Sequence, residues 1–180
     1  MIIICTAITF NRACHYFGRN LDLEFRYNER VTVTPRNYPF QFTNKDTINH
    51  HFALIGMATV VKDYPLYYDA TNEHGLSMAG LNFPGNAVYV EPVDGKCNVA
   101  SFELIPYILG KCRFVEEAET LLSDLRIVNI PFSQDIPPSP LHWIISDNKR
   151  SITVEPTSEG TMVYPNPVGV FTSSPRFPYH

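Results

Sequence analysis

The sequence predicts an α+β fold built on antiparallel sheet. Runs rich in β-branched and apolar residues fill both ends of the chain, and a helical period appears only between residues 98 and 125. The 15 prolines outnumber the 9 glycines, which favours many short elements, because proline ends helices and is confined to strand edges and turns. Consecutive strands joined by hairpin-length turns pair antiparallel, so we expect a sheet-rich chain with a central helical pair.

Strand-like stretches occupy the amino-terminal half. Turn-forming residues separate them, among them Asn28-Glu29, Pro65 and Pro84-Gly85-Asn86. Because β-branched and apolar residues bounded by such turns are typical of strands, we expect strands over residues 2–10, 31–34, 52–61, 76–81 and 87–90.

Two helices are expected next. Ser101 is a plausible N-cap for the first, and Pro106 limits that helix unless it lies in the first turn. Gly110 separates it from the second helix, in which Glu116 and Glu117 lie near the positive end of the helix dipole. Apolar residues at three- and four-residue spacings support both helices: Phe102, Leu104, Ile105, Ile108 and Leu109, then Val115, Ala118, Leu121, Leu122 and Leu125.

Strands return in the last third, over residues 141–146, 151–155, 161–164 and 168–172. The polar stretch Asp147-Asn-Lys-Arg150 reads as a hairpin turn between the first two. Before them, the proline-rich stretch 131–140 reads as a surface loop. Such a loop can line a pocket or act as a stiff connector.

Composition excludes several classes of function. A net charge of −4 with 44% hydrophobic residues is typical of a soluble globular chain and provides no basic surface for nucleic acid or a membrane. The apolar start Met1-Ile-Ile-Ile4 is too short for a signal peptide, and no stretch is long enough to span a bilayer. We therefore expect a cytoplasmic protein. Its cysteines and histidines show no metal-ligand spacing, and four free thiols are expected: Cys5, Cys14, Cys97 and Cys112.

Three short motifs point to chemistry when they are taken in order. They are Cys5-Thr-Ala7, Gly18-Arg-Asn-Leu-Asp22 and Gly80-Leu-Asn-Phe-Pro84. Each alone has an ordinary explanation, as a core cysteine or as a turn. Further short motifs lie between and after these three: Pro35-Arg-Asn37, Asp63-Tyr-Pro65, Asn72-Glu-His-Gly-Leu76, Leu141-His-Trp143, Ser146-Asp147 and Ser174-Pro175.

Together these motifs make the chain resemble the choloylglycine hydrolases, also called conjugated bile acid hydrolases, and the related penicillin V acylases. These enzymes are N-terminal nucleophile hydrolases. The resemblance implies an αββα sandwich of mainly antiparallel sheets, in a single domain over residues 1–180. Relatives continue well beyond residue 180, so we expect a domain that is truncated at its carboxyl end.

The resemblance also implies a mechanism. In the family the mature enzyme begins with the cysteine, here Cys5, whose thiol attacks an amide carbonyl while its own α-amino group acts as the base. Arg19 would favour the thiolate, Asp22 would hold the amino group, and the side chain of Asn82 would stabilise the oxyanion. No metal or organic cofactor is implied.

The implied reaction is hydrolysis of the amide bond in glycine- or taurine-conjugated bile salts, which are small-molecule substrates. Asn82 is similar to the bile salt branch, since the penicillin branch tends to carry tyrosine there. Leu21, Val61 and Ile136 match apolar positions that contact the steroid, although ordinary packing explains Leu21 and Val61 equally well. Two alternatives remain: an acylase of penicillin V or other N-acyl amides, and an inactive relative that binds bile salts.

Three features depart from the family pattern. Cys5 is preceded by four residues, so activity requires removal of residues 1–4 as a propeptide. Ser173 stands where the family has an asparagine near the substrate amide, and serine offers one hydroxyl in place of an amide group. The short chain is either a fragment or a shortened relative that covers its exposed sheet by forming a homo-oligomer.

Overall fold

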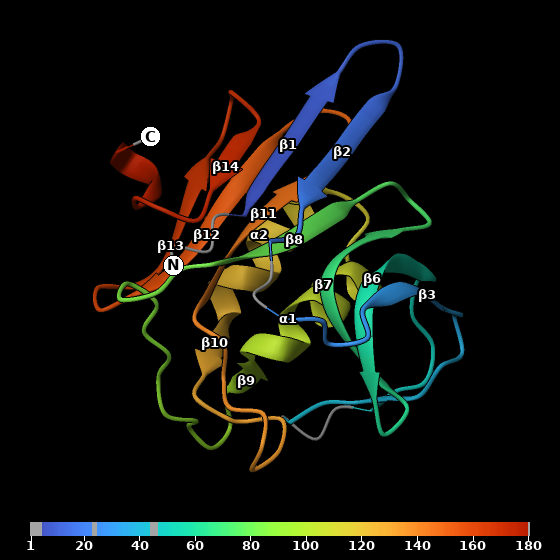
Figure 1. Ribbon diagram of the computed structural model, residues 1–180, viewed down its shortest axis with the longest axis vertical. Coiled ribbons are helices and arrows are strands. Elements are labelled where there is room, and N and C mark those ends of the chain that lie inside the picture. Colours follow the sequence, from blue (N-terminus) through green and yellow to red (C-terminus); the bar gives the residue numbers. More distant parts are fainter. Residues whose placement is uncertain (1–4, 23–24, 44–46, 180) are drawn as a thin grey trace.

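Seven strands form a large sheet in which every pairing is antiparallel (Figure 1). The computed structural model describes residues 5–22, 25–43 and 47–179. In spatial order the strands are β13 (Gly160–Pro165), β12 (Ser151–Thr157), β11 (Leu141–Ser146), β8 (Ser77–Asn82), β7 (Tyr64–Asn72), β6 (Leu54–Val61) and β3 (Arg30–Thr34).

A second sheet of three strands packs on one face of the large sheet (Figure 1). Its central strand β1 (Thr6–Asn11) pairs with β2 (His15–Asn20) and with β14 (Val170–Thr172). Between the sheets lies a small apolar core, made of Cys5, Ala7, Ala79, Leu81, Ile144 and Phe171. Cys5 is therefore buried between the two sheets, directly before the central strand of the small one.

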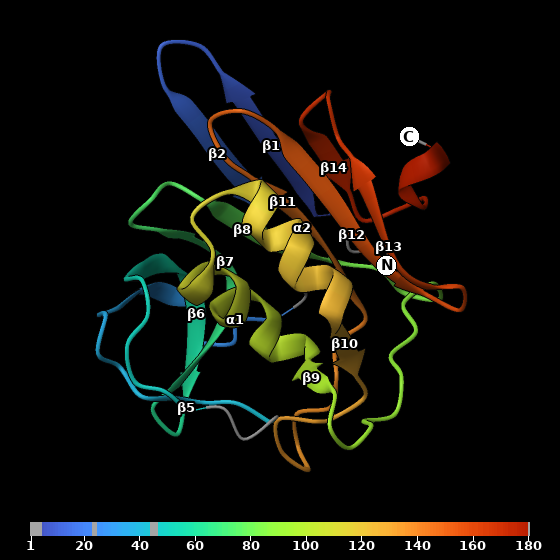
Figure 2. The ribbon, with the colours of Figure 1, turned by 180° about the vertical axis from the view of Figure 1, so that it is seen from behind.

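Helices cover the opposite face of the large sheet (Figure 2). They are α1 (Leu104–Lys111), preceded by the 3-10 turn η1 (Ser101–Glu103), and α2 (Val115–Asp124). This helical crossover brings β9 (Cys97–Ala100) and β10 (Leu125–Val128) together in parallel. The remaining short elements are β4 (Phe40–Gln41), β5 (Thr47–Ile48) and the 3-10 turn η2 (Phe177–Tyr179).

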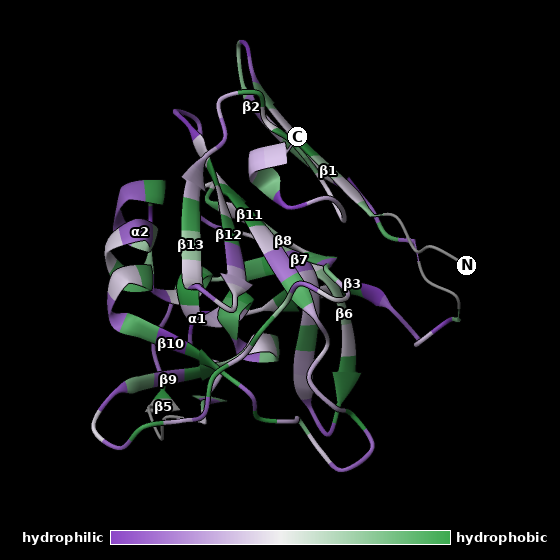
Figure 3. Ribbon diagram, turned by 90° about the vertical axis from the view of Figure 1, so that its left-hand side faces the viewer, coloured by the Kyte–Doolittle hydropathy of each residue, from purple (hydrophilic) through white to green (hydrophobic). Residues whose placement is uncertain are grey.

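The side view shows helices on one side of the large sheet and the β1–β2 hairpin on the other (Figure 3). The predicted α+β class with mainly antiparallel sheets is confirmed, and β9–β10 is the parallel exception. On the outer face of the small sheet, Ile8, Phe10 and Tyr16 are roughly half exposed. None of the helices in the described ranges covers these residues. No described helix is long and apolar enough to cross a membrane.

Six strands of the structure were not predicted from the sequence, and one strand was wrongly predicted. The six are β2, β7, β9, β10 and the two-residue strands β4 and β5. Leu125, expected in the second helix, begins β10. Pro65, expected in a turn, lies in β7. The tight turn is formed instead by Lys62 and Asp63, with φ of 50° and 64°. β2 is largely polar and shows no alternation. The expected strand 87–90 is only an isolated bridge from Val90 to Val128.

The helix boundaries also differ from the prediction. Ser101 does not cap α1 but begins the 3-10 turn, and the Glu103 carboxylate accepts the N–H of Ala100 at 2.8 Å. Gly110 lies inside α1 instead of ending it. Pro106 falls in the first turn of α1, where its missing N–H costs nothing. Residues 2–4 of the expected first strand lie outside the described residues.

Replacing Gly56 with alanine should destabilise the fold. Gly56 pairs with Ala70, and a Cβ there would overlap the Asp69 carbonyl and lie 2.6 Å from the Ala70 Cα. We expect Gly56→Ala to lower the free energy of unfolding by about 1–3 kcal/mol, measured by urea denaturation. Gly18→Ala is the matched control, because no atom lies within 4 Å of a Cβ built there. Equal stability of the two variants would contradict this packing.

Candidate active site around Cys5

The backbone of Cys5 is held by Ser173. The β1–β14 register pairs Thr6 with Thr172, which places Ser173 opposite Cys5. The Cys5 N–H donates to the Ser173 hydroxyl at 2.9 Å, and the Ser173 N–H donates to the Cys5 carbonyl at 3.2 Å. Both residues are only 3% exposed. The nitrogen of Cys5 therefore has a fixed place and a fixed hydrogen-bond partner.

The sulfur of Cys5 is held by Arg19. The β1–β2 register pairs Ala7 with Arg19, and the Arg19 Nη2 donates to the Cys5 Sγ at 3.1 Å. The Cys5 thiol in turn donates to the backbone carbonyl of Asp22 at 3.9 Å. A guanidinium this close to a sulfur stabilises the thiolate, which is the nucleophilic form.

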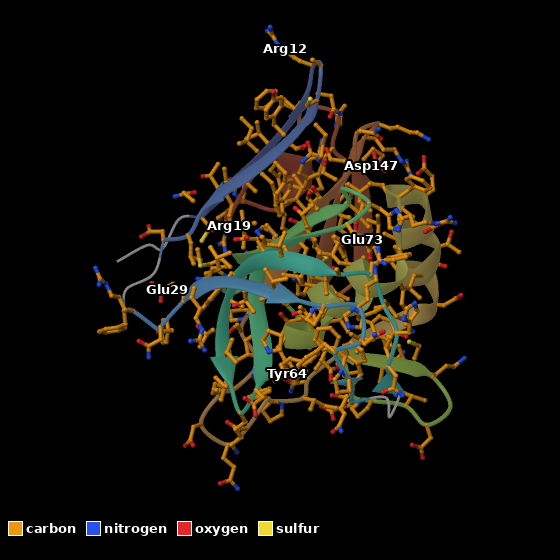
Figure 4. The ribbon with its side chains drawn as sticks, turned by 90° about the vertical axis from the view of Figure 1, so that its right-hand side faces the viewer. Arg12, Arg19, Glu29, Tyr64, Glu73 and Asp147 are labelled. Carbon is orange, nitrogen blue, oxygen red and sulfur yellow. The ribbon has the colours of Figure 1, made fainter. Side chains whose placement is uncertain are left out.

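Arg19 is itself almost completely buried, with 4% of its side chain exposed. Figure 4 shows it on the hairpin, beside the large sheet. Its Nη1 lies 3.7 Å from the Asp69 Oδ2. Burial raises the pKa of Asp69, and the Arg19 charge acts in the opposite direction. Neither Asp69 nor its strand, β7, was predicted from the sequence.

Asn82 ends strand β8, directly after Leu81, which shares the Cys5 core. The N–H of Phe83 donates to the Pro140 carbonyl at 2.8 Å. Because amides alternate in direction along an antiparallel strand, the Asn82 N–H points the opposite way, towards the side of β7. The β7–β8 pairing runs only from Thr71 and Ser77 to Asp69 and Ala79, and so stops short of Asn82. The backbone N–H of Asn82 thus points to the side of β8 on which Asp69 lies.

A buried imidazole connects the Asn82 end of the site with the Ser173 end. The His142 ring stacks on Phe83 at 4.0 Å between centroids and lies 4.1 Å from the ring of Phe171. In the sequence, Phe83 directly follows Asn82, and Phe171 lies two residues before Ser173. The His142 Nδ1 lies 3.1 Å from the carboxylate of the buried Glu155. This stack fixes the spacing between the two sheets at the site.

Comparison with known proteins identifies the family. The profile of the linear amide C–N hydrolases, choloylglycine hydrolase family, matches residues 5–180. The chain belongs to this family. It is 49% identical over 176 residues to a bile salt hydrolase/transferase of Lactiplantibacillus plantarum, covering 98% of this chain and 54% of the relative. It is 39% identical over 182 residues to one of Clostridium perfringens, covering 98% and 55%.

Solved structures agree with this assignment. Two variants of conjugated bile acid hydrolase from Clostridium perfringens superpose with a TM-score of 0.91 at 38% identity, covering 98% of this chain and 55% of theirs. Penicillin V acylase from Agrobacterium tumefaciens superposes with a TM-score of 0.79 at 20% identity, covering 97% and 54%, which shows the shared fold alone. The N-terminal nucleophile hydrolase fold is thus confirmed. The chain spans about half the length of the curated relatives it matches.

The structure places the residues that the family resemblance suggested in two groups. Arg19, Ser173 and the carbonyl of Asp22 each contact Cys5. Asn82 lies near this group at the end of β8, where Leu81 shares the Cys5 core. Half-buried Leu21 directly precedes Asp22. Val61 and Ile136 belong to a second region, where Tyr64, paired with Val61, lies 5.6 Å from the ring of Phe132 in the 131–140 loop. The roles assigned to these residues stay predictions.

Hollows on the surface lie away from Cys5. One of about 550 Å³ lies between α2 and β13, one of about 510 Å³ is lined by His50 and His74, and one of about 500 Å³ is lined by Phe10 and Lys149. Among the described residues, no three His, Cys, Asp or Glu side chains group as metal ligands. Cys5 itself is buried, and its contacts define the candidate site.

Removing the Ser173 hydroxyl should destabilise the fold at the site. Ser173→Ala leaves the buried Cys5 N–H without its acceptor, so we expect the free energy of unfolding to fall by about 1–3 kcal/mol in urea denaturation. The neighbouring Thr172→Ala removes only an exposed bond from Thr172 to the Ser174 carbonyl, and should change stability by less than about 0.5 kcal/mol. If Ser173→Ala costs no more than Thr172→Ala, the bond to Cys5 does not hold the site.

Proposed function

We propose that the protein hydrolyses the amide bond of glycine- or taurine-conjugated bile salts, with Cys5 as the nucleophile. One observation carries the proposal: the 3.1 Å contact between the Arg19 guanidinium and the Cys5 sulfur, next to a Cys5 nitrogen held by Ser173. A thiol beside a fixed cation and a nitrogen of the same residue supplies both a nucleophile and a base. Family membership adds the reaction class, cleavage of linear amides.

The base requires a free amino terminus at Cys5. While residues 1–4 are attached, the Cys5 nitrogen is an amide and cannot accept a proton. Once they are removed it becomes an α-amine, which titrates near pH ~7.7–8.0 and is partly neutral at physiological pH. We infer that residues 1–4, which lie outside the described residues, are a propeptide. The Ser173 hydroxyl would then hold the amine beside the sulfur.

The chemical steps follow from this placement. The α-amine takes the thiol proton, and the sulfur attacks the carbonyl carbon of the substrate amide. The tetrahedral intermediate collapses when the proton passes to the leaving nitrogen, which releases glycine or taurine and leaves a thioester on Cys5. Water then attacks the thioester, the amine again accepting a proton, and the bile acid leaves as the thiol is restored.

Asn82 is proposed to stabilise the oxyanion of these intermediates. The side-chain amide expected from the sequence is one donor. The direction of the β8 ladder adds a second, since the Asn82 backbone N–H points to the side of β8 on which Asp69 and Arg19 lie. One such donor typically contributes roughly 2.7–4 kcal/mol to transition-state stabilisation. The carboxylate of Asp22 is proposed to orient the amine.

Leu21, Val61 and Ile136 are proposed to contact the steroid. All three side chains are half-buried, so each retains apolar surface that a ligand can cover. Burying such surface contributes about 25 cal/mol per Å². The 38–49% identities all belong to relatives named for bile salts or bile acids, which favours a bile salt over penicillin V as the substrate. The single domain, the homo-oligomer and the cytoplasmic location stay predictions.

Incubation with glycocholate and taurocholate tests the proposed reaction. We expect free glycine or taurine, no release from Cys5→Ala, and normal release from Cys14→Ala, because Cys14 is exposed on the hairpin loop. Mass spectrometry of the active preparation should find Cys5 at the amino terminus. Turnover of penicillin V alone would favour the acylase, saturable binding without turnover would favour an inactive relative, and an active chain that retains Met1 would contradict the propeptide.

Restoring an asparagine at position 173 should raise turnover. Serine offers one hydroxyl, whereas the asparagine typical of the family offers two amide hydrogens and a carbonyl oxygen near the reacting amide. We expect Ser173→Asn to raise kcat for glycocholate by about tenfold, the effect of roughly 1.4 kcal/mol in the barrier. Steady-state kinetics measures it, with Ser173→Thr as the control that keeps a hydroxyl. No gain over Ser173→Thr would mean that the serine does not limit the rate.

A further inference from the structure

Burial of Arg19 raises the question of what balances its charge. In the described part of the chain, the Nε and Nη1 of Arg19 have no hydrogen-bond acceptor, and the Nη2 donates to the Cys5 sulfur. The Asp69 carboxylate, 3.7 Å from Nη1, is the counter-charge that the described residues provide. A buried charge that loses such a partner is strongly destabilised, so its side chain turns towards water.

Asp69 has a fixed position from which to hold Arg19. Its backbone lies in the middle of the large sheet, paired with Met57 on one side and Ala79 on the other. The Asp69 Oδ1 accepts the N–H of Met57 at 3.3 Å, at the bulge where the β6–β7 register shifts. This leaves Oδ2 for Arg19. The raised pKa of Asp69 comes from burial, and Arg19 opposes it, so each charge supports the other.

We propose that Asp69 is a positioning residue that holds the Arg19 guanidinium against the Cys5 sulfur. The proposal deepens the proposed function, because it takes Cys5 as the nucleophile that Arg19 activates. Asp69 does not contact Cys5 and acts through Arg19. The chain of contacts runs from the Met57 N–H through Asp69 and Arg19 to the Cys5 Sγ.

The direct and the indirect effect of Asp69 on Cys5 have opposite signs. A nearby negative charge by itself disfavours a thiolate, so removing it without moving Arg19 makes the sulfur more reactive. If Asp69 instead holds Arg19 in place, its removal releases the guanidinium and makes the sulfur less reactive. The direction of the change in Cys5 reactivity therefore separates a positioning role from mere proximity.

Alkylation by iodoacetamide, followed by peptide mass spectrometry, measures this reactivity. Exposed Cys14 in the same molecule is the internal reference for reagent and pH. We expect Asp69→Asn to lower the Cys5 rate relative to Cys14 by about tenfold, which corresponds to about 1.4 kcal/mol. The pH at which the Cys5 rate is half-maximal should move upward, and the same change made in an Arg19→Leu background should have no further effect.

Glu103→Gln is the matched control. Glu103 is also a buried carboxylate whose pKa burial raises, but its oxygens accept the N–H groups of Thr43 and Ala100 and not an arginine. It should leave the Cys5-to-Cys14 ratio unchanged. A crystal structure of the Asp69→Asn chain provides a second measurement, in which the Nη2–Sγ contact of 3.1 Å should be lost.

A faster or unchanged Cys5 in Asp69→Asn would overturn the proposal. So would an intact Nη2–Sγ contact in that variant, or an equal loss of rate in the Arg19→Leu background. These measurements need no turnover, so they are independent of the proposed reaction. A chain that shows the Asp69 dependence but releases no glycine from glycocholate would sink the bile salt hydrolase function and leave the positioning role standing.

Discussion

The site depends on one constraint: the charge of a buried guanidinium must be neutralised by a nearby counter-charge or polarisable group. Arg19 satisfies part of it through the Cys5 sulfur at 3.1 Å and part through the Asp69 carboxylate at 3.7 Å. Both partners are buried or partly buried, so the interactions are weakly screened and strongly directional. Because Cys5 is on the small sheet and Asp69 is on the large one, this one side chain also connects the two sheets.

The registers of the sheets bring the remaining groups to the same place. Strand β1 delivers Cys5, and its two neighbours deliver Arg19 and Ser173 to either side of it. Strand β8 of the large sheet ends at Asn82, and the His142 ring packs between the rings of Phe83 and Phe171. Residues far apart in the sequence thus meet because strand pairing leaves them little freedom.

The sequence predicted the fold class, the helical pair and most strands, since β-branched runs and turn residues mark them locally. Among the strands that it missed are β7, since Pro65 is typical of a turn, and β2, since His15, Gly18 and Asn20 show no apolar alternation. Asp69 lies in the missed strand β7, and its role depends on a contact with Arg19 of the other sheet, which no local pattern in the sequence reveals. Family motifs identified Cys5, Arg19 and Ser173, but only the folded structure shows that Arg19 and Ser173 both contact Cys5. A rule that a buried arginine needs a carboxylate could have prompted a search for Asp69.

The central claim is that the Cys5 sulfur forms a thioester with the substrate acyl group. Rapid mixing of the chain with glycocholate, acid quenching and peptide mass spectrometry tests it most directly. The account predicts a cholyl group on Cys5, in a peptide that begins with that residue, at times before glycine release becomes linear. Release of glycine with Cys5 unmodified, or with the acyl group on another residue, would contradict it.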